Sequence, residues 1–513
     1  MADLLLSPDI EPIPVLKLQL NLGACLDVPT GTWLPGKYDE RILNGGFGFI
    51  TGVLGIANNF KSTTANCMKA KAASRVFESC FRPEKKSEKK LRRMKTSISD
   101  YDTEVNAQEH RLKTLVASIR FFYDHNIDLF DYEQMLWKTT DKTVAAGDEF
   151  FEKIKEFIAV KRKLRKDYLV DTPFIDRDGK SLLQVILPTF GGIDSLTDFN
   201  TEAEEKIMDD NKLGDSGANM LFARGGLLKT RLLNELPALT GGGYHYMTLM
   251  AKLNKEMAMG GGPGGAAIPR KSMQYLKPGE KIVGAGNNFT YATSVTWNAY
   301  DAKPLLDGNR MPEYQNPDSP ALTMGDTDLN IVKLTCLRNK NGPTGMTIPI
   351  IVTQREGIQF ELTQFHYIRE FTSADKSKRP GIVGKGAYFT LALYPECAIT
   401  RNTLRGKIEE DGKLRNAIHY TCEILETSVY HPAIWADYAC DLEDLHADLI
   451  KLGYDWDLLL KCRPYFVFNN DTHPVPFLSS FDLLRMRKGE YHPYWMTEDK
   501  KGIKPEFQFE FLD

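Results

Sequence analysis

The chain has 513 residues, of which 42% are hydrophobic and 26% are charged, and its formal net charge is −3. This composition is typical of a soluble globular protein, and the length is too great for one hydrophobic core, so we expect roughly two to four domains. No apolar run approaches the ~18 residues of a membrane span, and the first residues lack a signal peptide, so we expect neither membrane insertion nor export.

The eight cysteines are scattered along the sequence. None forms a C-x-x-C pair, and none has a histidine at zinc-finger spacing. We interpret them as reduced, mostly structural thiols, and we therefore expect a cytoplasmic protein.

Residues 1–40 contain several prolines and glycines and are predicted to be an N-terminal lead-in of short extended pieces. The apolar run 47–54 is predicted to be a strand that breaks into a glycine-led turn. The turn and the residues after it are Gly55, Ile56, Ala57, Asn58, Asn59, Phe60, Lys61, Ser62 and Thr63. This is the layout of a P-loop, in which backbone N–H groups wrap phosphate at the start of a helix.

In a P-loop, Lys61 would contact the β- and γ-phosphates of ATP and Ser62 would bind Mg²⁺. Phe60 stands where the pattern has its second glycine. A chance Gly/Asn turn followed by a helix over residues 62–77 is therefore the alternative.

The strand-like residues 96–99 end in the acidic stretch Asp100, Tyr101, Asp102, Thr103 and Glu104. In a β-α-β unit this strand end lies beside the γ-phosphate, where a carboxylate can take a proton from the attacking water. We favour this catalytic role over a plain acidic turn.

Two basic runs, residues 82–93 and 153–166, are best interpreted as solvated surface, with phosphate contact as the alternative.

Residues 105–180 are mostly charged and are predicted to be a helical insertion. Further on, the strand-like run 182–187 is followed by Asp194, a position suited to holding Mg²⁺, although two glycines weaken this strand. Residues 219–236 predict a helix and residues 246–254 a buried strand.

Residues 259–271 are rich in glycine and proline and cannot pack a core, so we expect a mobile loop there. Strand signals resume at 289–297 and 330–337, which argues against a plain linker between domains. The strands 330–337 and 346–353 predict a β-hairpin whose turn carries Arg338 and Lys340. These cations are either solvated or reach a neighbouring subunit's γ-phosphate in a ring or filament ATPase.

The last part of the chain, residues 390–513, is predicted to be a separate, partly helical α+β domain of unknown role. Leu442, Leu445, Leu449 and Leu452 form an apolar stripe behind Asp441, a plausible N-cap. The tail is rich in aromatic residues, and we expect them to pack in a core rather than to stack on nucleic-acid bases.

In this order the motifs resemble the RecA/DnaB superfamily of ATPases, and they are most similar to the phage UvsX-type recombinases. UvsX-like proteins also carry a large residue, like Phe60, in place of the second P-loop glycine. Residues 101–104 are similar to their Tyr-Asp-Ser-Glu signature, whose Glu is the catalytic base, and residues 193–195 resemble the Ile-Asp-Ser of their Walker B motif. Residues 286–295 look like the segment that re-enters the sheet behind the mobile DNA-binding loop.

The resemblance covers about residues 40–365. It implies a RecA-like α/β core over residues 41–370, with a mainly parallel central sheet flanked by helices, the insertion at about 105–180 and the mobile loop at about 258–286. Within this core Glu104 would be the catalytic base, Ser62 and Asp194 would hold Mg²⁺, and Asn254 would sense the γ-phosphate. Arg338 and Lys340 match the paired basic residues of the family's inter-subunit hairpin.

The resemblance also implies a function. It predicts a DNA-dependent ATPase that uses ATP and Mg²⁺ and assembles on single-stranded DNA, with duplex DNA as a further partner, in phage recombination, repair and replication. Arg270 and Lys271 would contact DNA phosphates in the cytoplasm of an infected bacterium. Residues 338–345 also resemble the hairpin of DnaB-type helicases, so a hexameric helicase is an alternative to a helical filament. A nucleotide-gated DNA-binding factor that does not hydrolyse ATP is a third possibility.

Overall fold

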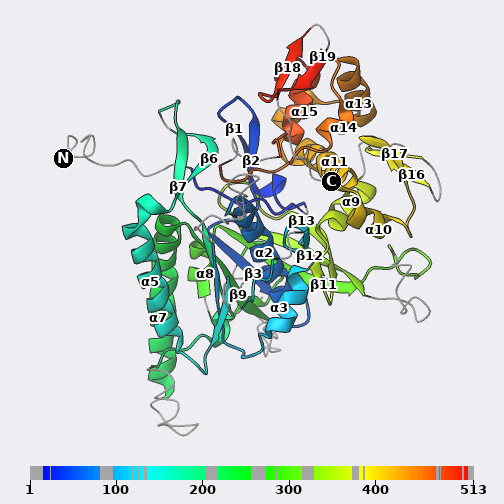
Figure 1. Cartoon of the computed structure of the whole chain (residues 1–513). Helices are drawn as coiled ribbons and strands as arrows, with labels where there is room; N and C mark the ends of the chain where they lie inside the picture. Colours follow the sequence, from blue (N-terminus) through cyan, green and yellow to red (C-terminus); the bar gives the residue numbers. More distant parts are fainter. Residues whose placement is uncertain are drawn as a thin grey trace.

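The computed structural model (Figure 1) describes residues 16–23, 25–80, 96–117, 119–124, 127–131, 136–176, 178–202, 218–255, 273–284, 286–314, 328–371, 380–384, 388–469, 473, 475–499 and 502–506. These residues form an α/β protein with a large mixed, largely parallel central sheet flanked by helices, and a helical C-terminal region. None of the helices in these ranges is both long enough and apolar enough to cross a membrane.

The central sheet has β3, the strand before the glycine-led turn, near its middle. Its order is β14 (Gly357–Ile358), β13 (Thr347–Thr353), β12 (Leu329–Asn339), β11 (Val295–Pro304), β3 (Ile50–Gly55), β9 (His245–Lys255), β8 (Thr189–Asp194), β4 (Ile98–Asp102) and β5 (Trp137–Asp141), with β10 (Glu280–Ile282) paired to β9. The strands from β11 to β5 run parallel to one another, whereas β10, β12, β13 and β14 pair antiparallel. Because parallel strands point the same way, the segments that follow β3, β4, β8 and β9 meet at one edge of the sheet.

Helices cover both faces of this sheet and define two hydrophobic clusters. One cluster includes α2 (Lys61–Cys80), α3 (Glu109–Val116), α4 (Arg120–Asp124) and α9 (Phe360–Glu370). The other includes α5 (Gly147–Lys163), α7 (Ala218–Gly243) and α8 (Gly286–Ala292). In α5, Phe150, Ile154 and Ile158 recur every four residues and are buried, so one stripe of this helix faces the core.

Several predicted elements are confirmed: the helix after the P-loop (α2), the helix at 219–236 (α7), the strand at 246–254 (β9) and the hairpin strands β12 and β13. The prediction for 289–297 is wrong in part, because α8 occupies its first half and β11 begins only at Val295.

The region 105–180 is less helical than predicted. Besides α3, α4, α5 and the 3-10 helix η2 (Arg165–Asp167), it contains β5, an edge strand of the central sheet, and β6 (Leu169–Ile175). β6 pairs with β7 (Leu182–Ile186), so the strand-like run 182–187 lies in a separate hairpin. Asp194 instead ends β8, a central strand that precedes the 3-10 helix η3 (Leu196–Asp198).

The N-terminal and C-terminal regions pack together, as Figure 1 shows at the top of the molecule. The N-terminal elements are η1 (Val28–Thr30), β1 (Thr32–Pro35) and β2 (Arg41–Asn44). The C-terminal elements are β15 (Ile382–Val383), β16 (Phe389–Leu391), β17 (Tyr394–Ile399), α10 (Leu404–Glu410), α11 (Gly412–Tyr430), α12 (Pro432–Tyr438), α13 (Leu442–Lys451), α14 (Trp456–Leu459), α15 (Ser480–Arg487), β18 (Met496–Asp499) and β19 (Gly502–Pro505).

The C-terminal region shares one continuous hydrophobic cluster with the N-terminal segment and the sheet, rather than forming a cluster of its own. The tail aromatics Phe466, Phe468, Phe477, Phe481, Tyr491 and Trp495 are buried, which confirms the core interpretation for them. In α13, Leu442, Leu445 and Leu449 are buried but Leu452 is exposed. Asp441 occupies the N-cap position, yet its side chain makes no capping hydrogen bond.

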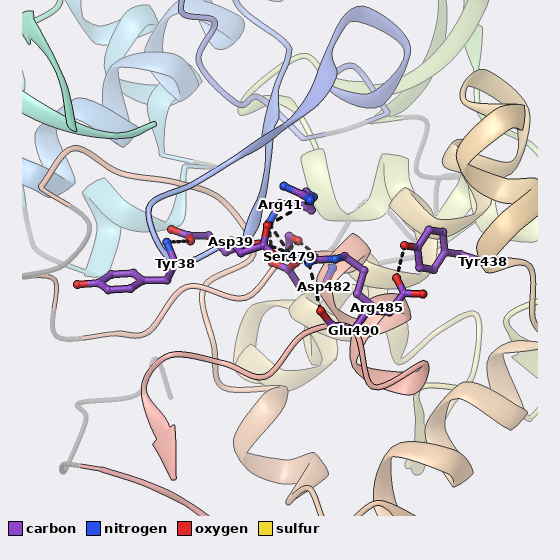
Figure 2. A network of polar contacts seen from close by, with 9 residues as sticks. Tyr38, Asp39, Arg41, Tyr438, Ser479, Asp482, Arg485 and Glu490 are labelled. Atoms are coloured by element: carbon purple, nitrogen blue, oxygen red, sulfur yellow. Dashed lines mark hydrogen bonds and ion pairs between the residues drawn. The ribbon is translucent and has the colours of Figure 1, made fainter. Parts of the chain in front are cut away.

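A polar clasp, partly buried, joins the β1–β2 hairpin to α15 (Figure 2). It consists of Asp39, Arg41, Ser479, Asp482 and Arg485. Both carboxylate oxygens of Asp482 accept from the backbone N–H of Arg41 at 3.0 Å, and Ser479 Oγ donates to Asp482 at 2.9 Å. Arg485 donates to Asp482 at 3.1 Å and forms an ion pair with Asp39. These donors offset only part of the desolvation of the fully buried Asp482, because burial still raises its pKa to about 7.

Candidate nucleotide-binding site

The glycine-led turn lies between β3 and α2, where a P-loop is expected. Phe60 has a φ of 56°, in the left-handed region that glycine adopts freely and other residues adopt only at a cost. Its half-buried ring packs against the main hydrophobic cluster, and its carbonyl accepts from Thr64 N–H at 2.8 Å. Phe60 thus keeps the backbone conformation for which the regular motif uses glycine. At Gly55 an added Cβ would lie 2.9 Å from the carbonyl oxygen of Ala299, so this first glycine has no room for a side chain.

The structure brings Lys61, Ser62 and Asp194 together at the carboxyl edge of the sheet. Lys61 Nζ lies 4.0 Å from Asp194 Oδ1. Burial raises the pKa of Asp194, and the negative charges of Glu104 and Asp102 raise it further. The positive charge of Lys61 and a hydrogen bond with Ser62 act in the opposite direction. Asp194 Oδ1 is buried and has no hydrogen-bond partner among the described residues. A carboxylate oxygen beside a serine hydroxyl is a donor set that fits a hard cation such as Mg²⁺.

Glu104 follows β4 directly beside Asp194. The register pairs Asp102 of β4 with Asp194 of β8, so both strand ends lie at the same level. The Asp102 carboxylate accepts from the backbone N–H groups of Glu104, Asn106 and Ala107 at 2.9, 2.6 and 2.6 Å. Asp102 therefore holds the turn that carries Glu104.

Lys252 on β9 holds Glu104 in place, and sequence reasoning missed this residue. Its Nζ lies 2.9 Å from Glu104 Oε1 and 2.9 Å from Asp198 Oδ2. The hydrogen bonds with Asp198 and Glu104 raise the pKa of Lys252, which stays charged. A lysine close to the end of the predicted strand 246–254 was the available signal, but no spacing in the sequence pairs it with Glu104.

A cavity of about 170 Å³ opens beside these residues. Its lining includes Ser62, Asp102, Glu104, Asp194 and Arg111 of α3. Arg111 donates to the carbonyl of Arg355 at 2.6 Å and adds a positive charge to an otherwise acidic lining. It lies in the region predicted to be an insertion, where no motif marked it.

The cavity reaches down to a buried ion pair between Lys69 of α2 and Asp100 of β4. Lys69 Nζ lies 2.5 Å from both carboxylate oxygens of Asp100, and Trp137 Nε1 donates to Asp100 at 2.9 Å. Burial lowers the pKa of Lys69, and the charge of Asp100 opposes this effect. Asp100 is thus a structural carboxylate.

Asn254 does not line this cavity. It is exposed on β9, opposite Lys281 of β10. Lys252, two residues earlier, is the β9 residue that contacts Glu104.

Arg338 and Lys340 lie at the opposite edge of the sheet from the P-loop. Arg338 pairs with Thr296, near the start of β11, whereas the P-loop follows Gly55, which pairs with Ala299 farther along β11. Lys340 donates to the carbonyl of Tyr291 at 3.0 Å and lines a second cavity of about 170 Å³. Within one chain these cations are therefore remote from Lys61.

The predicted DNA-contacting residues Arg270 and Lys271 lie outside the described residues, as does the basic run 82–93. The second basic run covers the later part of α5 and the residues after this helix, and most of its lysines and arginines are exposed. Lys161 is the exception, because it is buried and donates to Thr189 Oγ1 at 2.9 Å and to the carbonyl of Tyr244 at 3.2 Å.

Comparison with models of known protein families gives no match for this chain, and comparison with curated proteins gives none either.

Proposed function

We propose that this chain is a Mg²⁺-dependent ATPase with a RecA-like core that binds DNA and acts as a recombinase. The observation that carries the proposal is the convergence of Lys61, Asp194 and Glu104. They follow or end the strands β3, β8 and β4, and β4 is the neighbour of β8 in the sheet. A phosphate-binding loop, a metal-binding carboxylate and a second carboxylate for water activation are the parts that phosphoryl transfer to water requires.

Each residue has a distinct role in this proposal. Lys61 and the backbone N–H groups of residues 55–63 bind phosphate at the start of α2. Ser62 and Asp194 would hold Mg²⁺, which supplies charge neutralisation at the phosphate oxygens when it is bound. Glu104 orients the attacking water and accepts its proton, and Lys252 positions the Glu104 carboxylate.

ATP hydrolysis by purified full-length protein, measured with and without single-stranded DNA, tests the site. We expect Lys61→Ala to weaken nucleotide binding. We expect Glu104→Gln to preserve binding but to lower the DNA-stimulated rate by roughly 100-fold or more. Lys488→Ala and Glu410→Gln, which change a lysine and an exposed glutamate of the C-terminal region, are matched controls. Unchanged rates in both Lys61→Ala and Glu104→Gln would refute the assignment, and nucleotide binding without any phosphate release would favour a nucleotide-gated binding factor.

Self-association is the second part of the proposal. Because Arg338 and Lys340 lie at the opposite sheet edge from Lys61, they can reach a bound γ-phosphate only in a neighbouring subunit. Such a contact would stabilise transition-state charge across a subunit interface. The same geometry would serve a hexameric DnaB-like helicase, which is the second candidate function.

Electron microscopy of the protein with an ATP analogue and single-stranded DNA separates these two functions. Extended helical filaments support the recombinase, and closed six-fold rings support the helicase. Under the recombinase proposal, Arg270→Ala with Lys271→Ala should reduce DNA stimulation of the ATPase while DNA-independent turnover is retained.

A further inference from the structure

A second cluster of ligand-type side chains lies where the N-terminal segment meets α11. Cys25 precedes η1, and Cys422 and Glu426 lie one helical turn apart on α11. Their exposed fractions are 2%, 0% and 2%. Cys25 and Cys422 are 397 positions apart in sequence, so no spacing motif could have revealed the cluster.

The separations within the cluster suit a shared metal ion. The sulfur atoms of Cys25 and Cys422 are 3.5 Å apart, and one ligand atom from each of the three residues lies within 4.8 Å of the other two. Two thiolates bound to one tetrahedral Zn²⁺ at about 2.3 Å are about 3.8 Å apart, whereas the sulfurs of a disulfide are about 2.05 Å apart. The observed separation of 3.5 Å is therefore much closer to that of two thiolates bound to one metal ion than to that of a disulfide.

Glu426 supplies an independent observation. Its Oε1 is buried without a hydrogen-bond partner among the described residues, although the Cys25 thiol is hydrogen-bonded to the same carboxyl group. Two nearby carboxylates differ from it, because Asp27 accepts from the backbone N–H groups of Leu22 and Gly23, and Glu423 accepts from Ser480 and pairs with His419. A buried carboxylate oxygen without a donor is costly, and a cation between it and the two thiols would remove that cost.

We propose that Cys25, Cys422 and Glu426 bind one thiophilic divalent cation, with Zn²⁺ as the best fit. Two sulfur ligands select a soft or borderline metal, and a carboxylate is a common third ligand of Zn²⁺. Each thiol releases its proton to solvent as its sulfur–metal bond forms. The fourth coordination position is left to a water molecule or a further oxygen ligand.

The metal would join two distant parts of the chain next to the hairpin turn. In the segment after Cys25, the carbonyl of Val28 is 3.0 Å from His431 Nε2, and the carbonyl of Pro29 accepts from Asn339 Nδ2 at 3.4 Å. Asn339 is the last residue of β12 and lies between Arg338 and Lys340. The site would therefore hold in place the segment after Cys25, which contacts Asn339 between these two cations.

Elemental analysis of the full-length protein, purified without chelator, tests this proposal. We expect about one zinc ion per chain, and replacement by Co²⁺ should give a sulfur-to-cobalt charge-transfer band in the near ultraviolet. Cys422→Ser and Glu426→Gln should each lose the bound metal, and the charge-transfer band should be lost with it. Cys462→Ser, which changes another buried thiol of the C-terminal region, should retain both the metal and the band.

Folding of each variant is checked by circular dichroism, and Cys25→Ser provides a second thiol variant from the other side of the cluster. A metal-free protein that takes up neither Zn²⁺ nor Co²⁺ would overturn the proposal. Full metal content in folded Cys422→Ser, or a Cys25–Cys422 disulfide found by mass spectrometry of the unreduced protein, would also overturn it. None of these results depends on ATP hydrolysis, so the proposed metal site and the proposed ATPase activity are tested independently.

Discussion

At the scale of single residues, the three carboxylates of the stretch 100–104 have three different environments. Asp100 is paired with the buried Lys69, Asp102 accepts three backbone hydrogen bonds, and Glu104 contacts Lys252 beside the cavity. The sequence marks all three as acidic, and only the resemblance selected Glu104. The partners that distinguish them come from other elements, so sequence spacing could not reveal them.

Phe60 allows a prediction about backbone conformation. A left-handed φ disfavours any side chain by roughly 1 kcal/mol or more, whereas glycine adopts it freely. Phe60→Gly and Phe60→Ala both remove the half-buried ring, but only glycine relieves the backbone strain. We therefore expect Phe60→Gly to be more stable than Phe60→Ala by about 1 kcal/mol, as measured by urea unfolding.

The two variants also test the turn itself. Phe60→Gly restores the regular motif, so it should bind ATP at least as well as the natural chain. An alanine variant as stable as the glycine variant would mean that the left-handed conformation at this position is not retained.

At the scale of elements, Lys252 links β9 to the segments after β4 and β8 by contacting Glu104 and Asp198. Removal of the Lys252 side chain would leave the Glu104 carboxylate without this contact to β9. We expect Lys252→Ala to lower kcat roughly 10- to 100-fold with little change in KM, because the carboxylate loses its orientation.

Rescue by a conservative variant distinguishes this positioning role from a general structural one. Lys252→Arg keeps a cation that can contact Glu104, so it should restore much of the kcat that Lys252→Ala loses. Lys488→Ala removes a lysine whose ion pair with Glu490 lies in the C-terminal region, and it serves as the control. An unchanged kcat in Lys252→Ala would argue that the contact with Glu104 does not support turnover.

The strand β8 shows why some elements could not be read from the sequence. Gly191 and Gly192 weaken its strand signal, yet each is required by packing. An added Cβ would lie 2.9 Å from His245 Nε2 at Gly191, and 2.8 Å from Asp100 Oδ1 at Gly192. In contrast, α2 and β9 carry long uninterrupted patterns and were predicted correctly.

At the scale of the whole molecule, Glu78 connects α2 to the C-terminal region. Its carboxylate accepts from Tyr465 at 3.1 Å and lies 3.3 Å from His473 Nε2. Burial alone would raise the pKa of Glu78, but the hydrogen bond with His473 and the positive charges of His473, Arg463 and Arg75 lower it to about 2. The sequence predicted a separate C-terminal unit because nothing in the local pattern of α2 indicates these distant partners.

This depressed pKa predicts how stability depends on pH. The folded state holds the ionised carboxylate more tightly than the unfolded state does, so Glu78 stabilises the protein above pH 4.5 and this contribution is lost as the pH falls toward 2. The loss amounts to about 3 kcal/mol in the free energy of unfolding. Urea unfolding between pH 7 and pH 3 should give a smaller decrease for Glu78→Gln than for the natural chain.

Glu409→Gln, which changes an exposed glutamate of α10, should leave the pH dependence unchanged. If Glu78→Gln loses stability with falling pH as steeply as the natural chain does, the contact with His473 is not the source of the effect.

The polar clasp of Figure 2 also constrains when the fold can be completed during synthesis. Arg41 and Asp482 are 441 positions apart. At ribosomal rates of about 5–20 residues per second, the β1–β2 hairpin waits roughly 20 to 90 s for its partner to be translated. During that interval the N-terminal segment has apolar side chains without their final neighbours, and it is then a natural target for chaperones.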